Sequence, residues 1–78
     1  MAKTLRSPRH RQLIARIAEA RKSRGMTQAE LAKALGRPQS FIAKLEQGER
    51  RLEIIEFTDL ARALGQDPGE FLNRLLAR

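Results

Sequence analysis

Apolar residues recur along the chain every three or four positions, which is the spacing of amphipathic helices, and glycine and proline separate one run from the next. No segment alternates apolar and polar residues as a half-buried strand would. The pattern therefore predicts an all-α chain, with a flexible basic N-terminal arm over residues 1–7 and a single domain over residues 8–78. The five expected helices cover residues 8–24, 28–35, 38–47, 53–64 and 68–77.

Local signals define two short helices in the middle of the chain. Thr27 and Glu30 have the spacing of a capping box, which predicts the start of the second helix. Gly36 ends that helix, and Pro38 is expected at a first-turn position of the third. Two short helices joined by a glycine turn are the arrangement of a helix-turn-helix.

The third helix has two different faces. At about 100° per residue, Ile42 and Leu45 lie on one side and polar residues on the other. The apolar side can anchor the helix to the core while the polar side contacts base edges in the major groove of DNA. A solvated surface helix has the same pattern, so this face alone leaves both interpretations open. The candidate base-contacting residues are Gln39, Ser40, Lys44 and Phe41, the last at the border of the two faces and expected to be partly buried.

Several longer motifs resemble one known family. Residues 27–32 read TQAELA, residues 38–42 read PQSFI, residues 45–50 read LEQGER and residues 60–65 read LARALG. Together these motifs resemble the Cro/C1-type (XRE) helix-turn-helix family over residues 11–73. The resemblance implies a compact five-helix, lambda-repressor-like domain that binds double-stranded DNA and regulates transcription.

The resemblance also implies roles for individual residues. Gln28 matches a position that contacts a phosphate and braces the base-contacting Gln39. Arg21 and Glu46 match a pair that forms a structural ion pair between the first and third helices. Arg37 stands where a small polar residue is common, and we expect it to supply a charged contact instead. The resemblance thus implies phosphate contacts for Gln28, Gln47, Arg50 and Arg51, and with Arg37 these are the residues expected to contact phosphates.

Positive charge is concentrated at the N-terminal end. The chain carries a net charge of +7, and residues 1–24 hold eight basic residues against Glu19 alone. Such a segment attracts phosphate polymers, and we expect Lys3, Arg6 and Arg9 to reach a phosphate or a minor groove. A solvated basic tail would have the same composition.

The fifth helix carries an apolar stripe made of Phe71, Leu72, Leu75 and Leu76. We expect half of this stripe to complete the core and the remainder to form a homodimer interface. A two-fold dimer would place two recognition helices about one helical turn (~34 Å) apart over a palindromic site.

Other functions find little support in the sequence. The chain has no cysteine, which excludes disulfides and thiol nucleophiles, and its single histidine, His10, makes no metal site. Without an acid–base pair or a phosphate-binding glycine loop, we expect no catalysis, no metal and no cofactor. Since neither a signal peptide nor a long apolar run is visible, we expect a cytoplasmic protein that does not contact membranes.

The sequence therefore favours a sequence-specific repressor or autoregulator. A phage-type repressor, a controller protein of a restriction–modification system and an antitoxin all fit a chain of this size, and the last would have a toxin or another regulatory protein as a partner. Two alternatives remain: an adaptor that docks its third helix onto another protein, and binding of nucleic acid without sequence preference. Affinity that falls steeply with salt would favour DNA binding over the adaptor.

Overall fold

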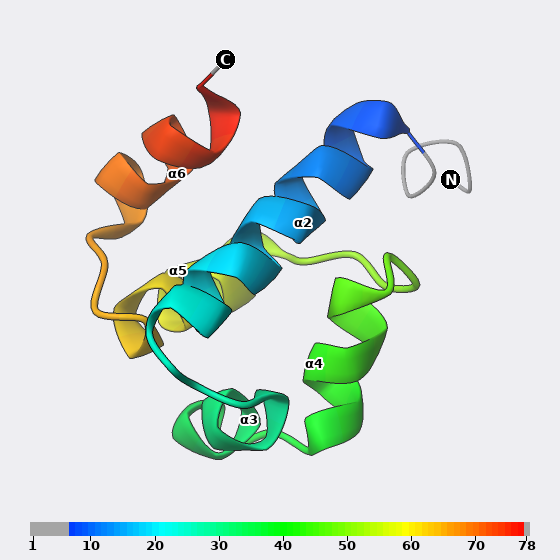
Figure 1. Cartoon of the computed structure of the whole chain (residues 1–78), viewed down its shortest axis with the longest axis vertical. Coiled ribbons are helices and arrows are strands. Elements are labelled where there is room, and N and C mark those ends of the chain that lie inside the picture. The colour runs from blue at the N-terminus through cyan, green and yellow to red at the C-terminus, as the bar shows by residue number, and fades with distance from the viewer. Residues whose placement is uncertain (1–6, 78) are drawn as a thin grey trace.

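The computed structural model describes residues 7–77, and these residues form five helices and no strand (Figure 1). Each helix bound lies within one residue of the range expected from the sequence, and the all-α fold class is confirmed. The expected basic arm, with Lys3 and Arg6, lies outside the described residues except for Ser7. The helices are α2 (Pro8–Ser23), α3 (Gln28–Leu35), α4 (Gln39–Glu46), α5 (Ile54–Ala63) and α6 (Pro68–Leu76).

Side-chain caps start three of the helices. The Thr27 hydroxyl accepts a hydrogen bond from the Glu30 backbone N–H at 3.0 Å, and the Glu30 carboxylate accepts one from the Thr27 N–H at 2.8 Å. Ser7 and Asp67 accept equivalent bonds at the starts of α2 and α6. Pro38 is the N-cap residue of α4, one position before the first-turn position expected, and α4 starts without a side-chain cap.

The turn between α3 and α4 depends on Gly36. Its φ of +66° lies in the left-handed region, which a residue with a Cβ adopts only at a cost of about 1–2 kcal/mol. The N–H groups of Gly36 and Arg37 donate to the carbonyls of Lys33 at 3.0 Å and Ala32 at 2.9 Å, so the last turn of α3 is closed. The chain therefore leaves α3 and enters α4 within a few residues.

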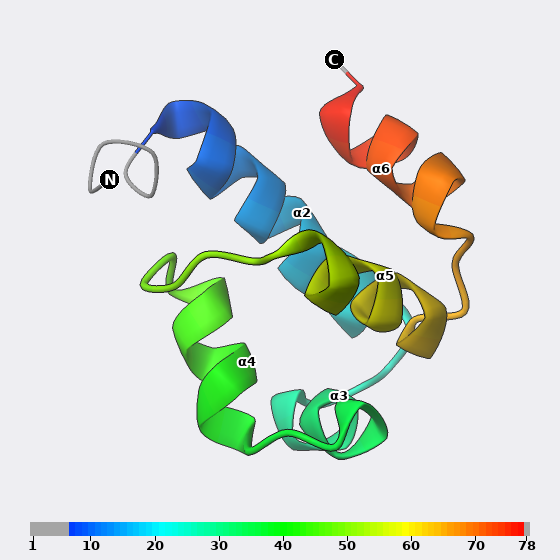
Figure 2. The ribbon, with the colours of Figure 1, turned by 180° about the vertical axis from the view of Figure 1, so that it is seen from behind.

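Figures 1 and 2 show how the helices are arranged. The first turns of α2 lie with α6 at one end of the molecule, α3 and α4 lie at the opposite end, and α5 lies behind α2 in the view of Figure 1. α4 packs on α3 and α2, whereas α5 packs on α3 and α6. Within the described part of the chain, no helix has the length and apolar character needed to span a membrane.

One core joins all five helices. Each helix contributes at least one side chain that is almost completely removed from solvent, and leucine and isoleucine dominate. The side chains that are fully enclosed are Ile17, Leu31, Ile42, Leu45, Leu60 and Leu64.

The apolar stripe of α6 is divided between the core and the surface, so only half of it is available to the expected dimer interface. Phe71 and Leu75 are buried in the core of the single chain, and the Phe71 ring stacks on Phe57 of α5 with ring centroids 5.7 Å apart. Neighbouring helical residues differ by about 100° in direction, so one surface cannot hold all four residues of the stripe. Packing on α2 and α5 buries Phe71 and Leu75 and leaves Leu72 and Leu76 exposed.

Candidate nucleic-acid interface

The outer face of α4 is open to solvent. Gln39, Ser40 and Lys44 are all exposed, while Ile42 and Leu45 on the inner side are fully buried. α4 is therefore fixed to the core along one side and presents polar side chains along the other, as the helical spacing predicted.

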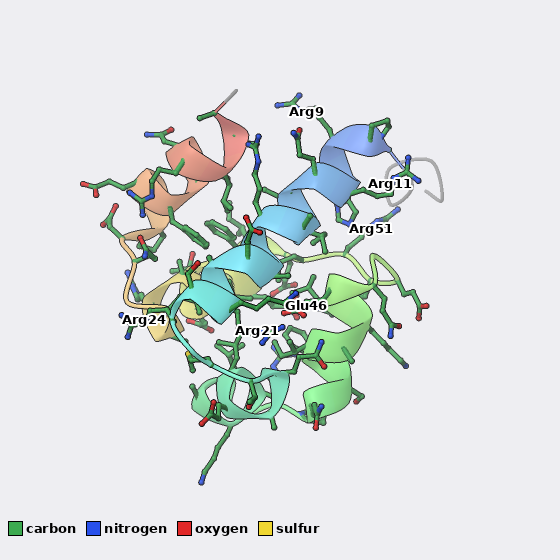
Figure 3. The ribbon with its side chains drawn as sticks, viewed as in Figure 1. Arg9, Arg11, Arg21, Arg24, Glu46 and Arg51 are labelled. Atoms are coloured by element: carbon green, nitrogen blue, oxygen red, sulfur yellow. The ribbon has the colours of Figure 1, made fainter. Side chains whose placement is uncertain are left out.

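An ion pair behind this face joins α2 to α4. Arg21 donates from Nε to Oε2 of Glu46 at 2.7 Å and from Nη2 to Oε1 at 3.0 Å, and Figure 3 shows the two side chains directed toward one another. This is the pair that the family resemblance implied. Arg21 also donates from Nη1 to the Met26 carbonyl at 2.6 Å, between α2 and α3. Burial raises the pKa of Glu46, but hydrogen bonds from Arg21 and Gln28 outweigh burial and hold the pKa below its usual value.

Gln28, the first residue of α3, belongs to the same network. Its Nε2 donates to Oε1 of Glu46 at 2.9 Å, so its partner is Glu46 and not Gln39, which it was expected to brace. A glutamine Nε2 carries two hydrogens, and the second is still available to a phosphate. The N-terminus of α3 also favours an anion there. The phosphate contact of Gln28 thus stays a prediction, with a different side chain orienting it.

A second cluster lies where α4, its flanking segments and α5 meet. Glu56 of α5 accepts hydrogen bonds from Nη1 and Nη2 of Arg50 at 3.0 and 3.3 Å, and Nη1 of Arg37 lies 3.3 Å from its Oε2. Both guanidinium carbons lie over the half-buried Phe41 ring, 4.7 Å (Arg37) and 4.4 Å (Arg50) from its centroid. The hydrogen bonds from Arg50 hold the pKa of Glu56 below its usual range against the opposing effect of burial. Three residues expected to face DNA therefore have protein partners.

The structure separates Arg9 from α4. Figure 3 shows Arg9 at the N-terminal start of α2, on the side of α6, where it lines a hollow with Gln12, Arg16 and Leu76. Arg11 instead points toward the side where α4 ends, and it lines a groove that also includes Gln47 and Gly48. Two residues apart on a helix differ by about 200° in direction, which explains why these arginines face opposite sides.

Sequence reasoning missed Arg11 and Glu56. Treating the N-terminal charges as one patch hid the difference between Arg9 and Arg11, although a helical projection based on the buried Ile14 separates them. For Glu56, the available signal was an acidic residue within an apolar helix. Its partners stand 6 and 19 positions earlier in the sequence, in segments that only the folded chain brings together.

This geometry defines the class of protein. Two short helices are joined by a tight turn, and the second is anchored on one side and exposed on the other, as in the helix-turn-helix of DNA-binding proteins. In agreement, residues 17–71 match the family model described as Helix-turn-helix.

Solved structures give the same result. The fold is similar to that of an XRE-family like protein from Pseudomonas syringae pv. tomato str. DC3000, with a TM-score of 0.83 and 49% sequence identity over 95% of this chain and 90% of that chain. It is also similar to the clp gene regulator ClgR from Corynebacterium glutamicum, with a TM-score of 0.76 and 24% identity over 86% of this chain and 71% of that chain. Comparison with curated proteins gave no match. The chain belongs to the Cro/C1-type (XRE) helix-turn-helix family, and its fold is that of DNA-binding transcription regulators.

Proposed function

We propose that the protein is a sequence-specific transcription regulator that acts in the cytoplasm as a repressor or autoregulator and binds a palindromic operator as a homodimer. One observation carries this proposal: α4 exposes Gln39, Ser40 and Lys44 while Ile42 and Leu45 hold its opposite side in the core. In the proposed complex α4 lies in the major groove.

The three exposed residues of α4 suit direct readout of bases. Gln39 can bond an adenine edge through its amide, Lys44 can donate to a guanine edge, and Ser40 can contact either a base or a phosphate. We propose a different role for Phe41, because Arg37 and Arg50 lie over its ring. Its main function is to support these arginines rather than to touch thymine methyl groups.

Phosphate contacts around α4 would fix the orientation of the protein on the duplex. Gln28 lies at the start of α3, Arg37 just before α4, and Gln47 and Arg50 just after it. Arg11 faces the same groove as Gln47. The proposed phosphate-contacting residues are Gln28, Arg37, Gln47, Arg50, Arg51 and Arg11, with Arg9 in reach only if the duplex extends past the start of α2.

The proposed dimer surface lies on α5 and α6. The large apolar side chains that are exposed lie on these two helices: Ile54 is 77% exposed, Ile55 62%, Leu72 39% and Leu76 48%. Ile54 and Leu72 also line an apolar groove together with Leu13, Leu52, Phe57 and His10. Protruding and hollow apolar features on one patch suit a two-fold interface, in which the same patch meets itself. A second copy would also enlarge the small core of a chain of this length.

A toxin or another regulatory protein is the second candidate for this surface. The observation that favours it is the same apolar groove, which a helix of a different protein would also fill. A chain that stays monomeric at every concentration and on DNA would favour this candidate over the homodimer.

The function is tested by selecting bound sequences from a random duplex pool. The proposal predicts enrichment of a palindrome whose half-sites lie about one helical turn apart, in agreement with two copies of α4. Binding without enrichment would indicate a non-specific nucleic-acid protein. No binding at low salt would leave α4 as a surface for contacting protein and overturn the proposal.

A further inference from the structure

The two arginines that flank α4 meet at one carboxylate. Arg37 lies in the turn before α4 and Arg50 in the loop after it, yet both guanidiniums reach Glu56 on the first turn of α5, at 3.3 and 3.0 Å. Glu56 also accepts a hydrogen bond from the Glu53 backbone N–H at 3.1 Å. A single acidic side chain therefore connects both ends of the recognition helix to α5.

The negative charge of this cluster is buried, and its two positive charges lie closer to the surface. The side chain of Glu56 is only 8% exposed, whereas those of Arg37 and Arg50 are 44% and 33% exposed. The carboxylate faces inward and the guanidiniums face solvent, so an anion approaching this surface meets two cations before it meets the buried carboxylate. The charges of Arg37, Arg50 and Glu56 sum to +1, and the exposed carboxylate of Asp59 lines the same hollow as Arg37 and Glu56.

The contacts with Glu56 leave donors on both arginines. Arg50 uses one hydrogen on each of two nitrogens, and a guanidinium carries five N–H hydrogens. Both guanidinium carbons lie over the Phe41 ring, within the distance of a cation–π contact. A free arginine loses much side-chain entropy when it is ordered on a ligand, and here that loss has already occurred in the folded protein.

The cluster lies at the edge of the base-reading face. On an ideal helix Phe41 lies about 60° around the axis from Lys44, on the flank between the exposed side chains and the core. When α4 occupies the major groove, such a flank is directed toward the sugar–phosphate backbone at the edge of the groove. The arginines over Phe41 are thus placed for phosphates and not for bases.

We propose that Glu56 is a positioning residue for DNA binding, which holds Arg37 and Arg50 against Phe41 so that both present ordered guanidiniums to phosphates beside the recognition helix. This inference rests on the proposed function. The inference predicts the direction in which Glu56 changes DNA affinity: its negative charge strengthens binding because it orders two cations. Simple electrostatics gives the opposite direction, since the loss of an acidic residue raises the positive charge of the protein.

The test compares Glu56→Gln with Asp59→Asn. Both variants remove one negative charge from α5 close to Arg37, because Asp59 lines the same hollow as Arg37 and Glu56. Asp59 is exposed, whereas Glu56 is the carboxylate that accepts hydrogen bonds from Arg50 and forms the ion pair with Arg37. Binding to the selected operator is measured by fluorescence anisotropy over a range of salt concentrations. We expect Glu56→Gln to bind roughly three- to tenfold more weakly than the parent protein, with a shallower salt dependence. Asp59→Asn should bind equally well or more tightly.

A double-mutant cycle with Arg50→Ala separates positioning from a general loss of structure. If Glu56 acts through Arg50, adding Glu56→Gln to Arg50→Ala should weaken binding by less than Glu56→Gln weakens it in the parent protein, and the loss that remains is the part that acts through Arg37. Additive losses, or tighter binding by Glu56→Gln, would overturn the inference. Arg50→Lys gives a measurement that leaves Glu56 in place: it keeps the charge but lacks the flat, forked group, so it should also bind more weakly. Operator affinity equal to that of the parent protein for Arg50→Lys would contradict the inference.

These outcomes are distinct from a failure of the proposed function. If Gln39→Ala, Lys44→Ala and Arg50→Ala all leave DNA binding unchanged, then α4 does not read DNA and the proposed function fails. If those variants lose affinity while Glu56→Gln does not, only the role of Glu56 is wrong.

Discussion

The Arg21 guanidinium and the Glu46 carboxylate meet at 2.7 Å between α2 and α4, and less than a tenth of either side chain is exposed. Replacing both residues of such a buried pair by apolar residues often changes the stability of a protein little. Removing only one of them is strongly destabilising, because it leaves an uncompensated charge in the interior. Here Glu46 also orients Gln28 at the start of α3. The pair therefore sets the position of α4 relative to both neighbouring helices.

Replacement of Arg21 by methionine should destabilise the protein strongly. We expect a loss of about 3–5 kcal/mol in the free energy of unfolding, because the Glu46 carboxylate stays buried without its partner. Urea denaturation followed by circular dichroism measures this loss. Arg62→Met, at an exposed position of α5, is the control and should change stability by less than about 0.5 kcal/mol. An equally small effect of Arg21→Met would show that the pair is not structurally important.

Stability should fall in acid because two glutamates have lowered pKa values. Interactions in the folded protein hold the pKa values of Glu46 and Glu56 below the usual value, which is about 4.3 in an unfolded chain. Their contribution is complete above that value and is lost as the pH falls through the lower pKa values of the folded state. Urea midpoints should therefore be level near neutral pH and decrease below about pH 4.3. Glu46→Gln should show a smaller decrease, and an unchanged pH dependence in this variant would contradict the assignment.

Substitutions on the outer face of α4 should affect recognition of the operator selectively. Gln39→Ala and Lys44→Ala should each cost about 1–3 kcal/mol on the selected site and little on random duplex. Anisotropy titrations against both duplexes give the ratio of the dissociation constants for random duplex and for the selected site. Arg62→Ala removes one positive charge from an exposed position of α5 and serves as the control for Lys44→Ala. Equal losses on both duplexes would mean that α4 contacts only the backbone.

Ile54→Asp should convert the proposed dimer into a monomer. Ile54 is the first residue of α5 and is mostly exposed, so the folded monomer should tolerate the change, and an acidic residue suits a helix N-terminus. Sedimentation at several protein concentrations should show a dimer for the parent protein and a monomer for the variant. Asn73→Asp adds the same charge at another exposed position and should remain dimeric. A parent protein that sediments as a monomer even on operator DNA would rule out this interface.

Local signals explain why the helices could be predicted. Thr27 with Glu30 and the left-handed Gly36 act on residues within one turn of themselves. Each end of α3 is therefore determined by residues that stand next to it in the sequence. The two faces of α4 follow from helical spacing alone, and the exposed Gln39 and buried Ile42 agree with it.

Non-local packing explains what could not be predicted. The apolar stripe of α6 did not reveal that Phe71 would stack on Phe57, because the packing angle between α5 and α6 cannot be inferred from the sequence of either helix alone. In the same way, no residue near Gln28 in the sequence indicates that its amide would donate a hydrogen bond to Glu46 and not to Gln39. The family resemblance supplied the Arg21–Glu46 pair, which spacing alone would not have given.

Hydrogen bonds from Arg16 of α2 link the C-terminal end of α6 to that helix. Nη1 of this arginine donates to the carbonyls of Leu75 and, at 2.6 Å, of Ala77, groups that would otherwise be left without partners at a helix C-terminus. Terminal helices usually fray, and their amides exchange hydrogen independently of the rest of a domain. Here the last turn of α6 is tied to the middle of the longest helix, so both should open in one cooperative unit, and the exchange rates of their amides should rise and fall together.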